Sequence, residues 1–140
     1  MEILTESAQQ TQDFGRTFAN KLKGGEILAL TGDLGSGKTT FMQGLAQGLG
    51  IEDRIISPTF VLVRTYKTAS GKNLYHLDLY RLEENIKKEL EKIGIEDFWN
   101  DEENIIVIEW ADRAREIIPN QAIWIDFQRS DGDSRKITVN

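Results

Sequence analysis

The sequence has no cysteine, one histidine and only two prolines among its 140 residues. The absence of cysteine excludes disulfide bonds and metal sites built on thiolates, and the single His76 cannot complete a zinc site with cysteine partners. No hydrophobic run in the sequence approaches the roughly 20 residues of a membrane-spanning helix, and no signal pattern opens it. We therefore expect a soluble, cytoplasmic protein with no membrane partner.

Positive charge is also scarce. The sequence has 17 Lys and Arg residues against 23 Asp and Glu residues, which gives a formal net charge of −6. Its basic residues are scattered rather than clustered, with Lys87-Lys88 as one short pair. Proteins that bind nucleic acid directly usually present a basic stripe. Any contact with nucleic acid is therefore expected to run through a partner.

The length and the hydrophobic patterns predict one domain, residues 1–140, with helices and strands in alternation. A chain of this size buries a core but leaves little room for a substrate lid. Strands are expected at residues 26–30, 60–66, 74–78, 105–108, 122–128 and 135–139, and helices at 7–22, 41–49, 83–93 and 111–118. The resulting fold class is α/β: a P-loop NTPase-type mixed sheet, with a parallel core and antiparallel hairpins, flanked by helices.

One stretch predicts a function. Residues 32–40, Gly-Asp-Leu-Gly-Ser-Gly-Lys-Thr-Thr, match the phosphate-binding pattern of glycine, four residues, then Gly-Lys-Ser/Thr. A buried-strand pattern precedes the motif, and apolar residues every fourth position follow it, as on one face of a helix. A glycine-rich turn that binds nothing is the alternative. The strand and helix on either side favour nucleoside triphosphate binding.

The chemistry of the motif assigns roles to its residues. Backbone amides of the loop and the positive end of the following helix would bind phosphate oxygens. Lys38 would reach the terminal phosphates, and the Thr39 hydroxyl would ligate Mg²⁺. The predicted ATP-binding residues of the loop are Asp33, Leu34, Gly35, Ser36, Gly37, Lys38, Thr39 and Thr40.

Two carboxylates are candidates for the metal site and for catalysis. Glu109 directly follows the apolar strand pattern of residues 105–108, and Asp78 closes the pattern of residues 74–77. Phosphoryl-transfer sites place an acid at such a strand end, near Mg²⁺. The alternative for each is a carboxylate that caps the next element or forms a surface ion pair.

For four other residues the type and position leave two possible roles each. Thr59, in Ser57-Pro58-Thr59, could bring its hydroxyl to the γ-phosphate, or could belong to a plain turn. Arg81 could reach phosphate or pair with a carboxylate. For His76 we favour a buried, hydrogen-bonded role over catalysis, and for Trp110 we favour packing over contact with nucleotide.

Several phrases together resemble the TsaE family (formerly YjeE), the bacterial ATPases of tRNA threonylcarbamoyladenosine synthesis. They are the phosphate loop, Ser57-Pro58-Thr59-Phe60, His76-Leu77-Asp78-Leu79-Tyr80-Arg81, Gly94-Ile95-Glu96-Asp97-Phe98 and Ile108-Glu109-Trp110. The resemblance runs from about Ser7 to the last strands. Ser36 and Phe60 stand where the family commonly has Ala and Tyr, and neither change affects the expected chemistry.

The resemblance implies a fuller functional assignment. It implies an ATPase that acts with TsaB and TsaD on adenosine 37 of tRNA, with tRNA held by those partners. It implies ATP on the loop from Asp33 to Thr40, with Mg²⁺ on Thr39 and Glu109. Asp78, Arg81 and Thr59 match further functional positions of the family, and the stretch that includes Thr11 matches one that approaches the base.

Two other functions remain as alternatives. A small-molecule kinase shares the phosphate loop, but such enzymes usually have an arginine-rich lid, and no arginine-rich segment occurs in this sequence. A nucleotide-gated binding module would associate with its partner without requiring turnover. Single-turnover measurements with the partner complex distinguish such a module from an ATPase.

Overall fold

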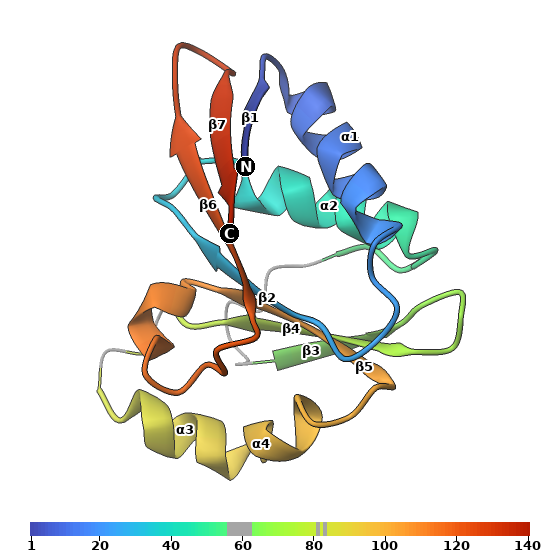
Figure 1. Cartoon of the computed structure of the whole chain (residues 1–140), viewed down its shortest axis with the longest axis vertical. Helices are drawn as coiled ribbons and strands as arrows, with labels where there is room; N and C mark the ends of the chain where they lie inside the picture. The colour runs from blue at the N-terminus through green and yellow to red at the C-terminus, as the bar shows by residue number, and fades with distance from the viewer. Residues whose placement is uncertain (56–62, 81, 83) are drawn as a thin grey trace.

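The protein, seen here in a computed structural model, forms a seven-stranded sheet with helices on both faces (Figure 1). The structure describes residues 1–55, 63–80, 82 and 84–140. The strands are β1 (Glu2–Thr5), β2 (Ile27–Thr31), β3 (Val63–Lys67), β4 (Asn73–Asp78), β5 (Asn104–Glu109), β6 (Ile123–Arg129) and β7 (Arg135–Val139). The helices are α1 (Ala8–Ala19), α2 (Lys38–Gly48), α3 (Ile86–Lys92), α4 (Ile95–Phe98) and the short 3₁₀ helix η1 (Ala111–Ala114).

The sheet has a parallel core with antiparallel edges, as the sequence predicts. Its strand order is β1-β7-β6-β2-β5-β4-β3. Strand β2 is parallel to both β5 and β6, and β4 is parallel to β5. The pairs β3–β4, β6–β7 and β1–β7 are antiparallel. The carboxyl ends of β2, β4, β5 and β6 therefore meet at one edge of the sheet, where open α/β sheets bind their ligands.

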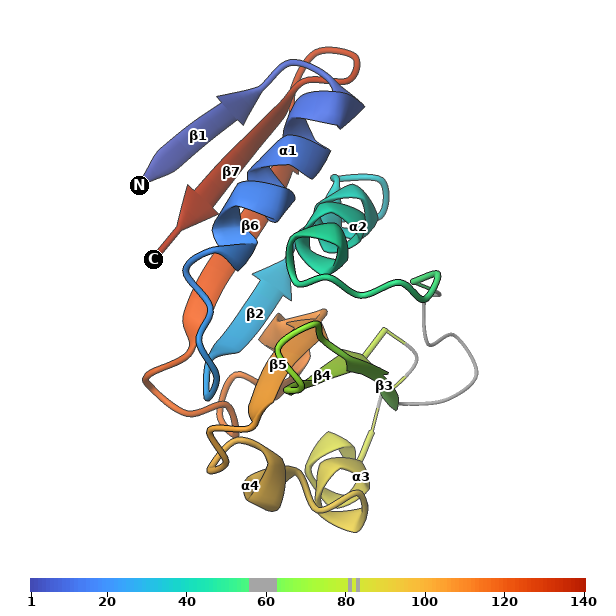
Figure 2. The same cartoon turned by 90° about the vertical axis from the view of Figure 1, so that its right-hand side faces the viewer.

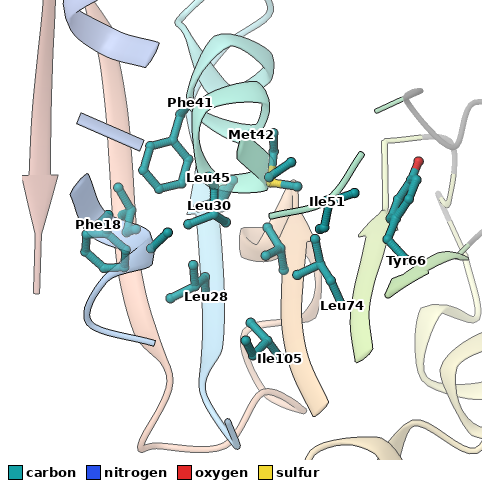
Figure 3. Packing of buried hydrophobic residues seen from close by; sticks show 14 of the residues in the cluster. Phe18, Leu28, Leu30, Phe41, Met42, Leu45, Ile51, Tyr66, Leu74 and Ile105 are labelled. Carbon is teal, nitrogen blue, oxygen red and sulfur yellow. The ribbon is translucent and has the colours of Figure 1, made fainter. Parts of the chain in front are cut away.

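Two apolar layers hold the helices onto the sheet. Side chains alternate along each strand, so Leu28 and Leu30 face α1 and α2, while Ile27 and Ala29 face the other side. Figure 2 shows α1 and α2 over one face and α3 and α4 on the opposite side. The first layer, part of which Figure 3 shows, includes Phe41 of α2 packed between aromatic rings of α1 and β6. The helix that follows the phosphate loop is thus anchored in the core.

Helices α1 and α2 cross at glycines that allow their backbones to touch. A Cβ added at Gly44 would collide with the carbonyl oxygen of Gln12, and one added at Gly15 would collide with that of Phe41. Because neither collision involves a flexible side-chain end, a larger residue would push the two helices apart. The glycines therefore determine how closely α2 lies against α1.

We expect Gly44→Ala to lower the free energy of unfolding by about 1–3 kcal/mol, because the added methyl overpacks the crossing. Urea unfolding followed by circular dichroism measures the change. Gln43→Ala is the matched control, since Gln43 is exposed one position earlier on the same helix. Equal stability of the two variants would show that the crossing tolerates a side chain.

The sequence predictions differ from the structure in several places. Strand β1 was not predicted, and residues 111–118 form only the 3₁₀ turn η1 and later turns rather than a helix. Ala111 and Ala114 are both buried, three residues apart, which suits a 3₁₀ turn. The predicted helix 7–22 ends earlier, because residues 20–22 form i→i−3 hydrogen bonds. Residues 60–62 of the predicted hairpin and residue 83 of the predicted helix lie outside the described residues.

Ser7 and Gln10, three residues apart at the start of α1, have the spacing of a capping box. The Ser7 hydroxyl accepts a hydrogen bond from the Gln10 amide at 3.1 Å, as expected. The Gln10 side chain, however, accepts from the Glu6 amide at 2.8 Å rather than from that of Ser7. Among the described residues, no helix is long and apolar enough to cross a membrane.

Candidate functional site

The glycine-rich loop lies at the carboxyl edge of the sheet, between the end of β2 and the start of α2. Gly32 has a φ of 134°, and a Cβ there would collide with the carbonyl oxygen of Phe127 on β6. Gly37, the N-cap of α2, has a φ of 111°. Such positive φ values strain residues with a side chain, so both positions favour glycine. The loop can curl back over the sheet because these positions have no side chain.

The start of α2 presents hydrogen-bond donors at the helix's positive end. Its N-cap, Gly37, has no side chain, and within the part of the chain that the structure describes no side chain caps the first amides of the helix. Within the loop, the Ser36 amide donates to the Asp33 carbonyl oxygen at 3.1 Å. Thr39 is exposed in the first turn of the helix. An uncapped helix start of this kind is suited to bind an anion such as phosphate.

Lys38 turns its ammonium group into the site. The residue is 5% exposed, and its Nζ donates to the Gly32 carbonyl oxygen. The same Nζ lies 3.7 Å from the ring centroid of Trp110. Burial lowers the pKa of Lys38, while the negative charges of Glu109, Asp78, Asp112 and Asp33 act in the opposite direction. Lys38 is thus a desolvated cation surrounded by carboxylates.

Glu109 and Asp78 end neighbouring strands, next to the phosphate loop. The sheet register pairs Glu109 with Leu30 of β2 on one side and with Asp78 of β4 on the other. Glu109 is 5% exposed, and its Oε2 lies 2.5 Å from His76 Nε2. Asp78 is partly buried and accepts a hydrogen bond from the Tyr80 amide at 2.9 Å. Both acids lie at the ends of strands, as the sequence predicts, and the register shows that they are neighbours; their roles stay predictions.

The residues His76 and Trp110 pack as the sequence predicts. His76 is 1% exposed and hydrogen-bonded to Glu109. Trp110 packs against the apolar layer that faces α3 and α4, and its ring also contacts that of Tyr80, with centroids 5.0 Å apart and planes tilted by 42°. Its φ of 58° is rare for a residue with a side chain. This backbone conformation accompanies the contact of the indole with Lys38.

A groove of about 560 Å³ borders the loop on the side of β6. Its lining includes Gly32, Asp33 and Ser36 of the loop together with Asp126 and Arg129 of β6. Asp126 accepts a hydrogen bond from the Thr31 hydroxyl at 2.7 Å, so the carboxylate ties β6 to the strand before the loop. The Ser36 hydroxyl oxygen is buried and has no hydrogen-bond partner among the described residues. The Ser36 hydroxyl oxygen is therefore available for a further hydrogen bond beside the groove.

Sequence reasoning missed one residue that holds the loop. Arg135 of β7 donates to the Gly35 carbonyl oxygen at 3.0 Å and to the carbonyls of Gly132 and Ser134, both at 2.9 Å. Its side chain also lies next to Gly37. Arg135 lies 100 positions from Gly35 in the chain. No local pattern could have revealed this contact.

The remaining predicted residues have different outcomes. Thr11 of α1 is 1% exposed, and its hydroxyl lies 2.7 Å from the Thr5 hydroxyl. Its methyl group is one of the neighbours that a side chain at Gly37 would meet, so Thr11 lies beside the loop, and its predicted approach to the base stays a prediction. Leu34 is exposed and Thr40 is half-buried. Thr59 and Arg81 lie outside the described residues, and their predicted roles stay predictions.

The residues present fit a magnesium nucleotide. Mg²⁺ prefers oxygen ligands and is usually held by one or two protein oxygens together with substrate phosphates. Thr39 offers a hydroxyl at the helix start, and Glu109 keeps one carboxylate oxygen beyond the one that contacts His76. No group of three or more His, Cys, Asp or Glu side chains able to hold a metal ion occurs within the described part of the chain. A site completed by phosphate oxygens is consistent with that finding.

Comparison with known proteins gives one family. A family model described as "Threonylcarbamoyl adenosine biosynthesis protein TsaE" matches residues 5–137. A Bacillus subtilis protein called "tRNA threonylcarbamoyladenosine biosynthesis protein TsaE" is 36% identical over 134 residues, covering 96% of this chain and 81% of that protein. A protein with the same name from Haemophilus influenzae is 40% identical, covering 90% of this chain and 80% of the relative.

The same likeness extends to a cyanobacterial relative and to a solved structure. The protein of that name from Synechocystis is 42% identical, with 86% of this chain and 76% of the relative covered. The crystal structure of Bacillus subtilis YdiB superposes with a TM-score of 0.78 at 34% identity, covering 99% of this chain and 83% of the other. The mixed sheet with its flanking helices is therefore also the fold of a solved protein.

Proposed function

The chain belongs to the TsaE family of tRNA threonylcarbamoyladenosine biosynthesis proteins, and on that premise we propose that it is an ATPase. It binds Mg²⁺-ATP at the loop between β2 and α2 and hydrolyses it slowly alone. It acts with TsaB and TsaD in the modification of adenosine 37. The observation that supports ATP binding most directly is the desolvated Lys38 beside an uncapped helix start.

Each group at the site has a proposed task that follows from its chemistry. The amides at the start of α2 and in the loop bind the phosphate oxygens, and Lys38 supplies positive charge to the terminal phosphates. Thr39 and Glu109 would hold Mg²⁺, which supplies charge stabilisation at the transferred phosphoryl group when bound. Asp78 would orient water or a metal-bound ligand next to Glu109. Thr59 and Arg81 are proposed to assist at the γ-phosphate, and Thr11 to lie near the base.

The charge at the site favours a metal-dependent reaction. Four carboxylates, those of Asp33, Asp78, Glu109 and Asp112, act on a single buried ammonium group. An ATP molecule adds further negative charge to this edge of the sheet. A divalent cation offsets that repulsion, and this is the physical reason for including Mg²⁺ in the proposal.

The family and the composition support a proposal for the partners and the compartment. Because the chain is acidic overall, with a formal net charge of −6, we propose that tRNA is contacted only through the TsaB–TsaD complex. The proposed location is the cytoplasm, where ATP and tRNA are present. A small-molecule kinase or a nucleotide-gated module without turnover are the alternatives. Product analysis separates them: a kinase phosphorylates an added acceptor, and a module binds its partner without releasing phosphate.

We expect Glu109→Gln to fold normally and to lose most Mg²⁺-dependent hydrolysis, by about tenfold to a hundredfold, because it keeps the shape but removes the charge. Asp78→Asn is expected to act in the same direction. Phosphate release at increasing Mg²⁺ concentration, with partners present, measures both. Native rates in both variants would show that the two acids are structural.

A matched control is available at the other end of the sheet edge. Asp126→Asn changes a carboxylate in the middle of β6 that accepts a hydrogen bond from Thr31 and is not among the carboxylates that act on Lys38. It should leave the Mg²⁺ dependence unchanged. A loss in Asp126→Asn equal to that in Glu109→Gln would mean that the measurement reports general damage to the edge.

A further inference from the structure

A histidine and a carboxylate lie in contact beneath the phosphate loop, in an otherwise apolar part of the core. His76 is 1% exposed and Glu109 is 5% exposed, and their Nε2 and Oε2 atoms are 2.5 Å apart. We propose that His76 is a positioning residue for Glu109. It holds the carboxylate so that its other oxygen is directed to the divalent cation bound with the nucleotide. The inference rests on the proposed function.

The sheet register places the two side chains together. His76 on β4 pairs with Val107 on β5, and Asp78, two residues on, pairs with Glu109. Alternation puts His76 and Glu109 on the same face as Leu74 and Val107, which belong to the layer beneath α1 and α2. The contact is thus a diagonal one between neighbouring parallel strands, on the face from which α2 and Lys38 rise. His76 lies one layer deeper in the core than the acid that it contacts.

Stability alone does not account for a histidine at this position. Its other ring nitrogen, Nδ1, is buried and has no hydrogen-bond partner among the described residues. A buried polar atom without a partner lowers the stability of the fold. An apolar residue of similar size would remove that cost and would extend the layer formed by Leu74 and Val107. We therefore attribute the presence of a histidine at this position to the contact of its Nε2 with Glu109.

That contact constrains the carboxylate in a way that suits metal binding. When Glu109 is ionised it can only accept hydrogen bonds, so Nε2 carries the proton and donates it. The hydrogen bond engages Oε2, and the lone pairs of Oε1 stay available. A ligating carboxylate held by such a partner loses less freedom when the metal binds, and removal of the partner typically costs tenfold to a hundredfold in metal affinity.

The mechanism predicts a selective effect. Contacts between phosphate and the loop amides or Lys38 do not involve His76, so nucleotide binding without metal should not depend on it. Metal binding together with nucleotide should depend on it through Glu109. The informative quantity is the ratio of ATP dissociation constants measured in EDTA and in Mg²⁺, which reports the coupling between metal and nucleotide.

Two substitutions test the inference by calorimetric titration with ATP. His76→Leu removes the donor and keeps an apolar side chain of similar size, so it should reduce the ratio by about tenfold or more while leaving the dissociation constant in EDTA unchanged. His76→Gln keeps an N–H donor near the position of Nε2 and should retain most of the native ratio. Thermal unfolding should show that His76→Leu is still folded at the temperature of the titrations. A ratio that is native in His76→Leu, or equally reduced in both variants, overturns the inference.

A double-mutant cycle tests whether His76 acts through Glu109. If it does, the double variant His76→Leu/Glu109→Gln should have the same ratio as Glu109→Gln alone. Once the Glu109 charge is gone, loss of the contact with His76 has no further effect on metal binding. Additive losses would show that His76 acts independently and would overturn the inference. Asn104→Ala is the matched control. It removes buried polar contacts at the opposite end of β5 and should lower stability without changing the ratio.

The same titrations separate this inference from the function on which it rests. A native protein that binds no ATP, or a native ratio in Glu109→Gln, contradicts the proposed function. Metal-dependent ATP binding that needs Glu109 but not His76 contradicts only the inference.

Discussion

Replacing Lys38 with alanine is expected to weaken ATP binding by about a hundredfold or more and to leave no measurable hydrolysis. Lys38 holds its ammonium inside the site, against the Gly32 carbonyl and the Trp110 ring, with its pKa lowered by burial. A charge held in a desolvated place acts on phosphate more strongly than one in water. Calorimetry with ATP in Mg²⁺, and phosphate release with partners present, measure the two losses.

The fold should survive this substitution, which makes the loss interpretable. Because burial lowers the pKa of Lys38 in the folded protein, the native state disfavours its charged form relative to the unfolded chain. The charge therefore opposes folding fully at pH values below the folded pKa, and this opposition diminishes as the pH rises from the folded pKa to the unfolded one. Lys38→Ala removes this unfavourable contribution of the buried charge, and alanine is well suited to the first turn of a helix.

The control for Lys38→Ala is another lysine of the same protein. Lys88 is exposed on α3, away from the loop, so Lys88→Ala should bind ATP as the native protein does. Circular dichroism should find all three proteins equally helical. Native ATP affinity in folded Lys38→Ala would contradict the assignment of the phosphate site to this loop.

The parts of the fold that the sequence predicts are those with a local cause. Residues 105–108 form a continuous apolar run, and β5 is buried along its whole length, between β2 and β4. The start of α1 at Ser7 follows from a side chain that accepts from an amide three residues later. The position of the loop of residues 32–37 follows from the glycine spacing together with the strand pattern before it and the helix pattern after it. In each case a few neighbouring residues determine the conformation.

The parts that the sequence does not predict depend on contacts between distant segments. Strand β1 has an exposed Leu4 and becomes a strand because β7, at the other end of the chain, pairs with it. The contact of Arg135 with the Gly35 carbonyl depends on the same β7. The crossing of α1 and α2 at Gly15 and Gly44 depends on the angle between two helices, which periodicity does not encode.

The candidate site likewise has features that the sequence predicts and features that depend on contacts between distant segments. The pairing of Glu109 with Asp78 could be predicted, because strand-end acids gather at one edge of a parallel sheet. The burial of His76 could be predicted from its position in an apolar strand. Its partner could not, because the diagonal between β4 and β5 depends on their register.

Adding a TsaB–TsaD complex is expected to accelerate ATP hydrolysis by about a thousandfold, and this proposed partnership is testable in a purified system. Two arginines beside the site already have other contacts: Arg135 donates to loop carbonyls, and Arg113 donates to the Leu82 carbonyl and lies over the Tyr80 ring. Carboxylates around Lys38 further offset its charge. We propose that transition-state charge is only partly compensated in the isolated chain and that a partner supplies the remainder.

Thermodynamic linkage then requires that the partner complex bind the ATP-loaded and ADP-loaded forms of the chain with different affinities. If docking stabilises the γ-phosphate, ATP must strengthen docking by the same factor, so the complex should bind the ATP-loaded chain more tightly than the ADP-loaded chain. Lys38→Ala, which is expected to bind little nucleotide, should show one affinity in both conditions. Binding measurements with a slowly hydrolysed ATP analogue and with ADP, alongside hydrolysis rates, test both halves. If the complex binds the ATP-loaded and ADP-loaded chains equally and does not change the hydrolysis rate, the partnership is contradicted. The chain would then be an ATPase that stabilises the transition state with its own residues.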